Sequence, residues 1–355
     1  MATIERLALL AGEESRSAVR LALRTAMNDA DPDVAAAALA ALGVAGGFED
    51  IGAVIDAVAS GRAAVLGSAM TALSALAARW PEQAAVAALS ARRDERAALP
   101  VAIVIGTLGG GVLGDAVDDV AFLSAAMSSA DPETRKAAVD AIAKIGLESG
   151  LDAVELAVAD EVRDVQLSAV RALGRLRTGE GRRPGVDRLI DLTGGNDAEI
   201  AAAAARALGE ATDPRACASL VALVGSASPI VAVAAVEALG RIRDRASIEA
   251  LISVGEDVHV EVTKAVLLAL DRIADSRAFA RVGRALDHDA WDVRRVAADC
   301  LGRFGGHAAA DLLRARLAIE KEPIVAEAIV EAIASLEAPP SVRCRPSIAP
   351  GRADT

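Results

Sequence analysis

The sequence predicts an all-α fold, an α-solenoid of about ten two-helix repeats over residues 1–337. Three observations predict it: a short phrase that returns along the chain, a regular spacing between its copies, and a composition rich in Ala and Leu. Self-similarity at a period of about 20–50 residues is the signature of repeat architectures. Each unit packs only on its neighbours, so one continuous core can run through a chain of this length.

The recurring phrase is Ala-Leu-Gly in its clearest copies and Cys-Leu-Gly or Ala-Ile-Ala in others. The commonest step between copies is 31 residues, as from Gly209 to Gly240. In seven of the copies a Val or Ile, such as Val231, lies nine residues before the end. The copies end at residues 43, 77, 106, 143, 174, 209, 240, 271, 302 and 334. We therefore expect ten equivalent units.

The phrase lies in the second helix of each unit, which opens with capping residues. An Asp side chain accepts hydrogen bonds from the first free N–H groups of a helix, and Pro lacks the donor that would be left unpaired there. Apolar residues then recur on one helical face, and the closing Gly lets a neighbouring helix approach closely. The clearest openings are Asp31-Pro32-Asp33, Asp131-Pro132-Glu133, Asp197-Ala198-Glu199 and Glu322-Pro323.

The first helix of each unit has a weaker signal, with examples expected at residues 50–59, 214–224, 245–254 and 275–286. The two longest steps run from 106 to 143 and from 174 to 209, and their extra residues fall at 107–115 and 178–185. Insertions in solenoids form loops on one face, often a binding face, although an ordinary surface loop is the simpler explanation. Residues 338–355, rich in Pro, Arg and Ser, are expected to form a disordered tail.

Composition narrows the class of partner. The formal net charge is −12 and only 2% of the residues are aromatic, with no Tyr. Both features disfavour nucleic-acid binding, because phosphates repel an acidic surface and bases stack on aromatic side chains. The three Cys are far apart and no secretory signal pattern opens the chain, so we expect a cytoplasmic protein.

Two uncharged stretches, 97–114 and 216–236, are long enough to raise the question of membrane insertion. Gly109–Gly111 interrupts the first stretch, and Ser226, Ser228 and Pro229 interrupt the second where the repeat register places a turn. Buried repeat helices explain both stretches, and no membrane insertion is expected.

The phrase Ala-Leu-Gly-x-Ile after an Asp-Pro-x-Val opening resembles HEAT repeats, in particular the short HEAT-like type of phycobilisome lyase subunits. The resemblance covers residues 4–336. It implies a HEAT-like solenoid whose second helices line a concave groove. Families with this repeat include scaffolds, bilin lyase subunits, a DNA glycosylase and a di-iron hydroxylase, so the resemblance is specific for fold and weak for function.

Catalytic constellations are not found in the sequence. The hydroxylases use paired His-Glu motifs, whereas His259, His288 and His307 lie at unrelated repeat positions and none precedes Glu. We therefore expect neither a metal centre nor a cofactor. The segment from Asp287 to Arg295 crowds acids, a His and a Trp, but its register is that of an ordinary helix opening. Trp291 covers an apolar edge or anchors a partner.

The repeat register also aligns a row of basic side chains. Residues three before and one after the end of the phrase lie four apart and share one helix face. The simpler alternative to a binding role is an ordinary solvated surface. Three acid–base pairs have the spacing of same-helix ion pairs, as that alternative requires: Asp140–Lys144, Glu237–Arg241 and Asp299–Arg303. Arg171 and Arg175 do not fit that alternative, and with Arg206 they form a candidate basic patch. The candidate partner-binding residues are Arg171, Arg175, Arg206, Arg241, Arg272, Arg303 and Trp291.

These observations favour a non-enzymatic cytoplasmic scaffold or adaptor that binds a protein partner in its concave groove. The alternative is a subunit of a bilin-lyase-like enzyme acting on a chromophore or in protein modification. A third possibility is structural packing in a larger assembly. The sequence specifies neither the partner nor the oligomeric state.

Overall fold

The computed structural model describes residues 13–255 and 258–337. It divides into two compact units, Met1–Gly185 (unit 1) and Val186–Thr355 (unit 2). In the described part of the chain every regular element is a helix, apart from one isolated bridge between Leu147 and Arg177. The predicted all-α class is therefore confirmed.

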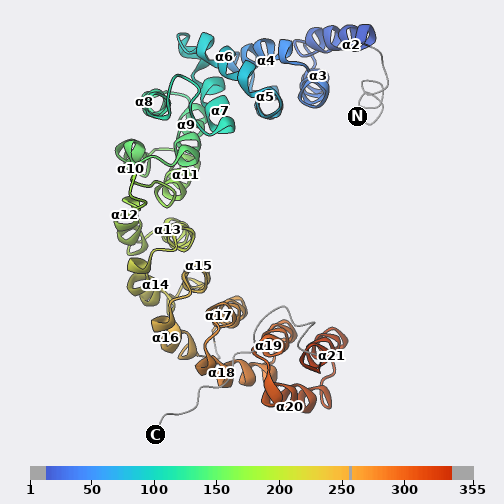
Figure 1. Ribbon diagram of the computed structural model, residues 1–355, viewed down its shortest axis with the longest axis vertical. Helices are drawn as coiled ribbons and strands as arrows, with labels where there is room; N and C mark the ends of the chain where they lie inside the picture. Colours follow the sequence, from blue (N-terminus) through green and yellow to red (C-terminus); the bar gives the residue numbers. More distant parts are fainter. Residues whose placement is uncertain (1–12, 256–257, 338–355) are drawn as a thin grey trace. The chain divides into compact units, whose positions relative to one another are not determined.

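Unit 1 consists of helices that follow one another in pairs (Figure 1). They are α2 (Glu13–Ala26), α3 (Pro32–Ala45), α4 (Ile51–Ala59), α5 (Ala63–Arg79), α6 (Pro81–Ala91), α7 (Ala98–Leu108), α8 (Ala116–Ala126), α9 (Pro132–Ile145), α10 (Leu151–Ala157) and α11 (Arg163–Leu173). Short 3-10 helices precede three of them: η1 (Phe48–Asp50), η2 (Glu95–Ala97) and η3 (Glu148–Gly150).

Unit 2 continues the pattern. Its helices are α12 (Gly185–Thr193), α13 (Ala198–Ala211), α14 (Cys217–Leu223), α15 (Pro229–Ile242), α16 (Ile248–Ile252), α17 (Val260–Ile273), α18 (Phe279–Arg284), α19 (Trp291–Phe304), α20 (Gly306–Leu317) and α21 (Pro323–Glu337). Its 3-10 helices are η4 (Pro214–Ala216), η5 (Arg245–Ser247), η6 (Ser276–Ala278) and η7 (Ala285–Asp287).

Each unit has two layers of helices. The odd-numbered helices are the second helices of the repeats; they pack on one another and form what we call the inner layer (Figure 1). The even-numbered first helices form the outer layer. Between α2 and α21 the described residues hold ten such pairs, and every predicted phrase lies within an odd-numbered helix or at its end. The predicted solenoid of about ten repeats is confirmed.

The glycine that closes the phrase allows the inner helices to pack closely. A Cβ placed on Gly240 would lie 2.8 Å from the Ala269 Cα, and one placed on Gly209 would lie 2.7 Å from the Ala238 Cα. Neither position has room for a side chain, because the backbone of the next inner helix occupies it. The phrase therefore combines an apolar residue for the core with a Gly for helix contact.

The capping pattern forms as expected. Asp31 accepts a hydrogen bond from the Asp33 amide and Asp131 from the Thr134 amide, both at 2.9 Å. His259 caps α17 in the same way, because its Nδ1 accepts from the Glu261 amide at 3.2 Å. These bonds satisfy amides in first turns that have no partner inside the helix.

The two predicted insertions differ. In the 107–115 segment, the amides of Val112 and Leu113 donate to the buried Asp119 carboxylate at 2.9 and 2.8 Å, so part of this insertion packs against α8. In the 178–185 segment, residues 179–182 are exposed, and Glu180 and Arg182 form an ion pair at 2.9 Å. The predicted tail, 338–355, lies outside the described residues, and the predicted domain boundary at 337 stays a prediction.

The uncharged stretches fold as separate elements. The 216–236 stretch forms α14, a turn at 225–228 and the start of α15, while Gly109 ends α7 inside the 97–114 stretch. Among the described helices, none combines the length and the apolar character that a membrane crossing needs.

Candidate binding surface

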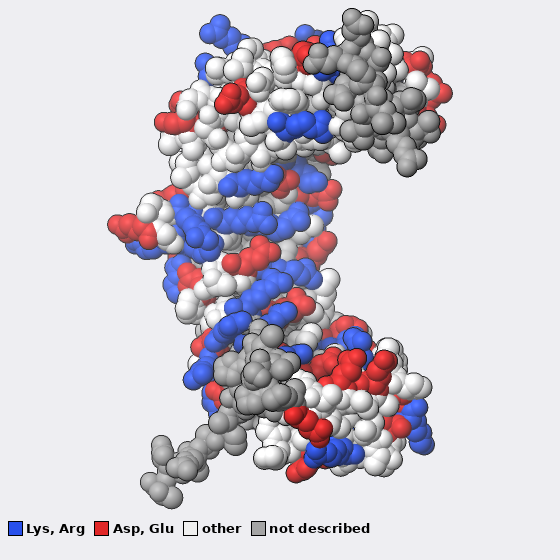
Figure 2. All heavy atoms as spheres, turned by 45° about the vertical axis from the view of Figure 1, so that its right-hand side comes forward, with Lys and Arg blue, Asp and Glu red and all other residues white. Residues whose placement is uncertain are grey.

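The predicted arginine row lies on the inner layer. In unit 2, the row consists of three exposed residues, each one position after a phrase: Arg241 on α15, Arg272 on α17 and Arg303 on α19. Arg206 of the candidate patch is exposed on α13. Figure 2 shows basic side chains gathered on the face turned toward the viewer, with acidic ones between them. The helix register thus presents these arginines to solvent from one layer.

Two predicted residues lie in unit 1. Arg171 is exposed on α11, where its Nε donates to the Leu167 carbonyl at 3.1 Å, and Arg175 is exposed just after the helix. Arg206 lies in unit 2, so the predicted patch of Arg171, Arg175 and Arg206 would need residues from both units. The patch stays a prediction.

The stems of two row arginines lie over the glycines of the preceding repeat. The Arg241 Cδ is 3.6 Å from where a Gly209 Cβ would stand, and the Arg272 Cδ has the same distance to Gly240. The phrase glycine therefore leaves apolar surface that a long Arg side chain covers while its guanidinium stays in water. Neither Arg241 nor Arg272 forms an ion pair with any described residue.

The three same-helix ion pairs that the spacing offered do not form among the described residues: Asp140–Lys144, Glu237–Arg241 and Asp299–Arg303. Arg303 instead reaches the preceding helix, where its Nε donates to both oxygens of Asp271 at 2.9 Å. Asp140 accepts from the Ser168 hydroxyl at 2.7 Å. Arg303 and Asp140 therefore bond to the neighbouring inner helix and not to a charged residue of their own helix.

A hollow of about 390 Å³ lies on the inner layer of unit 2, between α15, α17 and α19. Trp291 borders it with 45% of its surface exposed, and Leu268 contributes with 39% exposed. Both are large apolar residues that a folded chain more often buries. The remaining lining residues are Val233, Glu237, Glu261, Lys264, Ala265, Asp292, Arg295 and Val296.

The charges in this hollow are partly compensated. The Lys264 ammonium lies 2.7 Å from Glu261 and 2.8 Å from Asp292, so it bridges α17 and α19. Its hydrogen bond holds the pKa of Asp292 below its ordinary value, and the Asp292 and Glu261 carboxylates raise the pKa of Lys264. Arg295 and Glu237 make no such pair within the described residues.

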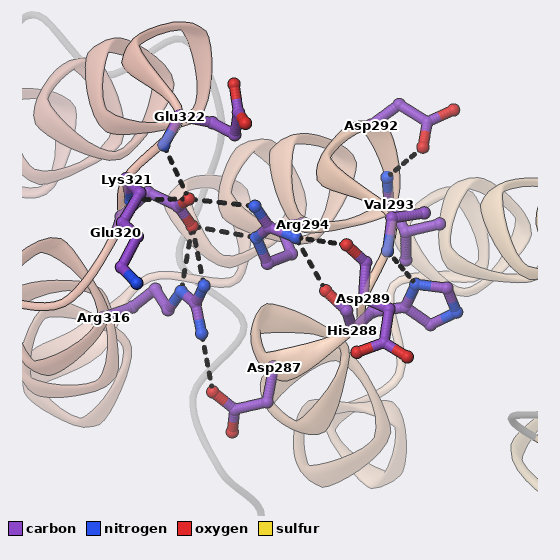
Figure 3. A network of polar contacts seen from close by, with 11 residues as sticks. Asp287, His288, Asp289, Asp292, Val293, Arg294, Arg316, Glu320, Lys321 and Glu322 are labelled. Atoms are coloured by element: carbon purple, nitrogen blue, oxygen red, sulfur yellow. Dashed lines mark hydrogen bonds and ion pairs between the residues drawn. The ribbon is translucent and has the colours of Figure 1, made fainter.

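A buried ion pair fixes the start of α19, where Trp291 lies. Arg294 donates from Nε and Nη2 to both oxygens of Glu320, at 2.8 and 2.9 Å, while its Nη1 bonds the His288 and Asp289 carbonyls (Figure 3). The Glu320 side chain is 1% exposed, and it also accepts from Arg316. The bidentate contact from Arg294 holds the pKa of Glu320 far below its ordinary value.

Unit 1 repeats this clamp at the same register position. Arg135 in α9 donates to both oxygens of Asp160, at 2.7 and 2.9 Å, and to the Ser129 and Ala130 carbonyls. The pKa of Asp160 is lowered chiefly by this contact. Sequence analysis missed both clamps, although Arg135 and Arg294 each lie eight residues before the end of a phrase.

Arginines of the outer layer in unit 2 are paired across repeats. Arg215 bonds Asp187 of the preceding first helix and Asp213 of its own turn, both at 2.9 Å. Arg277 repeats this arrangement with Glu249 and Asp275, at 3.0 Å each, and its hydrogen bond lowers the pKa of Asp275. We call Arg215 and Arg277 the outer staples, since each connects two neighbouring first helices.

The repeats of unit 2 match a known family. Residues 186–270 and 248–334 match the model of the HEAT repeats family. Residues 186–334 are HEAT repeats. This region is most of unit 2, and it includes the row arginines of unit 2 as well as Arg206 and Trp291. A comparison with curated protein sequences gave no match.

Solved structures share the HEAT solenoid fold. Importin beta in an ammonium sulfate condition matches with a TM-score of 0.56 and 14% identity, over 92% of this chain and 51% of importin beta. A triple mutant of Kap121p matches with a TM-score of 0.51 and 14% identity, over 90% of this chain and 41% of Kap121p. This chain thus spans about half the length of importin beta and less than half that of Kap121p, and at these identities the likeness shows the fold alone.

The complex of CpcE and CpcF of phycocyanin lyase from Nostoc sp. PCC7120 matches with a TM-score of 0.39 and 23% identity. That match covers 61% of this chain and 94% of the other. A TM-score this low does not establish a shared structure.

The two cysteines that the structure describes lie in unit 2, where Cys300 is buried and Cys217 is partly buried. Burial raises the pKa of the Cys300 thiol to about 12 and that of Cys217 to about 11, so both are protonated at neutral pH and are weak nucleophiles. The described residues contain no group of three or more His, Cys, Asp or Glu arranged to hold a metal ion.

Proposed function

We propose that this protein is a non-enzymatic scaffold or adaptor, cytoplasmic in location, that binds a protein partner along the inner layer of its HEAT solenoid. One observation carries the proposal. Arg241 and Arg272 are exposed on successive inner helices and have no carboxylate partner among the described residues, whereas the outer staples are each held by two.

The chemistry of this surface fits a protein better than a nucleic acid. A guanidinium fork binds a carboxylate through two parallel hydrogen bonds, so it suits Asp and Glu side chains or a chain terminus. The net charge of −12 opposes a polyphosphate partner. Karyopherin Kap121p, which matches the fold with a TM-score of 0.51 at 13% identity, has been solved bound to the extreme C-terminus of the protein phosphatase Cdc14p.

The test is capture of a partner from an extract of the native organism with the immobilised full chain. R241E/R272E reverses two charges on the inner layer, and R188E/R245E makes the same charge change at exposed outer positions. We expect one protein to be retained by the wild type and by R188E/R245E, and to be depleted at least tenfold on R241E/R272E. Circular dichroism checks that each variant is folded.

Equal retention by all three proteins would contradict the proposal. A coloured tetrapyrrole eluting without a protein would favour the lyase-like alternative instead. A further variant, R171E/R175E/R206E, tests the predicted patch: loss of the partner supports a role for it, and undiminished capture removes it from the site.

A further inference from the structure

One inner helix of unit 2 combines an exposed apolar residue with an uncompensated cation. Leu268 of α17 lies three residues before the end of its phrase, at the position where α15 has Glu237 and α19 has Asp299. Arg272, four residues further on, therefore has no acid at same-helix pairing distance. The adjacent Asp271 is already bound through both oxygens by Arg303.

Leu268 also connects this cation to the hollow. It lines the hollow with Val233, Val296 and Trp291, and it is 39% exposed. The hollow measures about 390 Å³, which is room for one bulky apolar side chain. An apolar recess and an unpaired guanidinium thus lie one helical turn apart on α17.

We propose that α17 binds an extended segment of the partner through two side chains: a bulky apolar one in the Trp291 hollow and a carboxylate on Arg272. This inference rests on the proposed function and names the chemistry of its ligand. Residues four apart on a helix have Cβ atoms about 5–6 Å apart. Alternate residues of an extended chain lie about 6.6 Å apart on the same side, so the two ligand residues are separated by one residue.

The charges around the hollow favour binding of the partner's carboxylate at Arg272 over any other position on α17. Among the described residues, the only cation that α17 places in the hollow is Lys264, which Glu261 and Asp292 already neutralise. A carboxylate beside Lys264 would meet both of these acids, whereas one beside Arg272 meets a free guanidinium whose stem is fixed over Gly240. The expected motif is an apolar residue, any residue, and Asp or Glu, in either chain direction.

The experiment is selection of random 12-residue peptides displayed on phage against the immobilised full chain. We expect enrichment of peptides with Phe, Leu, Ile, Met or Trp two positions from Asp or Glu. A synthetic peptide of the most enriched sequence should bind R272E and L268E at least tenfold more weakly than the wild type. R188E, a charge reversal on the outer layer, should bind it unchanged.

Enrichment of basic peptides, or of none with this spacing, would overturn the inference, as would equal binding by wild type, R272E and L268E. So would a dimer in sedimentation that L268E disrupts, because the hollow would then be covered by a second copy of the chain. These failures leave the proposed function standing if R241E/R272E still loses its partner. Retention of the partner by R241E/R272E refutes the proposed function separately.

Discussion

The inner and outer layers of unit 2 use the same side chain in two ways. On the outer layer, the staples Arg215 and Arg277 each hold two carboxylates and connect neighbouring first helices. On the inner layer, Arg241 and Arg272 rest their stems on glycines and keep their guanidinium groups unpaired among the described residues. The contrast shows that the residues of the neighbouring repeat decide whether an arginine connects two repeats or keeps its guanidinium open to a ligand.

The cause of this difference is the packing of the phrase. Inner helices approach so closely at Gly209 and Gly240 that the next arginine lies flat across the preceding helix. In the repeat where Asp271 replaces the phrase Gly, Arg303 pairs with it and is no longer available.

The largest effect is expected at the buried clamp of Arg294 and Glu320, which belongs neither to the inner row nor to the outer staples. R294A leaves Glu320, with a 1% exposed side chain, without its bidentate partner. Removing one partner of a buried ion pair costs about 3–5 kcal/mol, and Arg316 offsets part of this loss. Urea unfolding should show a decrease of about 3 kcal/mol, and a change below that of R241A would contradict the assigned role of the clamp.

The phrase glycine provides the next test. G240A places a methyl group 2.8 Å from the Ala269 backbone, so it should destabilise the protein by about 1–3 kcal/mol despite the better helix propensity of Ala. Gly52 in the outer-layer helix α4 has no atom within 4 Å of the place where a Cβ would stand, and G52A should stabilise by up to about 1 kcal/mol. Thermal unfolding of both variants measures the contrast; equal shifts in the same direction would contradict it.

Acid should weaken the clamps selectively. The pKa values of Asp160 and Glu320 are lowered in the folded protein, while unfolded Asp and Glu titrate near about 3.9 and 4.3. Their stabilising contribution is therefore complete above these unfolded values and is lost as the pH falls through the folded ones. We expect the free energy of unfolding to fall as the pH is lowered below about 4.3, with a smaller fall in E320Q. Equal slopes in the two proteins would count against this explanation.

The smallest expected effect is the difference in unfolding free energy between an outer staple variant and an inner row variant. Arg215 is half exposed, so R215A should lower the free energy of unfolding by less than about 1 kcal/mol. R241A removes no ion pair and should change it less than R215A does. Chemical unfolding measured at low and at high salt tests this, because screening should reduce the cost of R215A and leave R241A unaffected.

The sequence was sufficient to predict the repeat, its ten units and the capping Asp residues, because these follow from local spacing and helix chemistry. It also placed Arg241, Arg272 and Arg303 on one layer. It did not reveal that Arg303 is paired while Arg272 is not, since that depends on Asp271 in the preceding helix. The hollow beside Trp291 was likewise missed, because it is formed by three helices whose contributions lie in different repeats.

The most direct test of the central claim is the affinity of the captured partner for two matched variants. R241A/R272A removes the unpaired inner arginines, and R215A/R277A removes the outer staples. We expect at least tenfold weaker binding by R241A/R272A at unchanged stability, and wild-type binding by R215A/R277A at reduced stability. Wild-type affinity in R241A/R272A, or a matching loss in folded R215A/R277A, would contradict it.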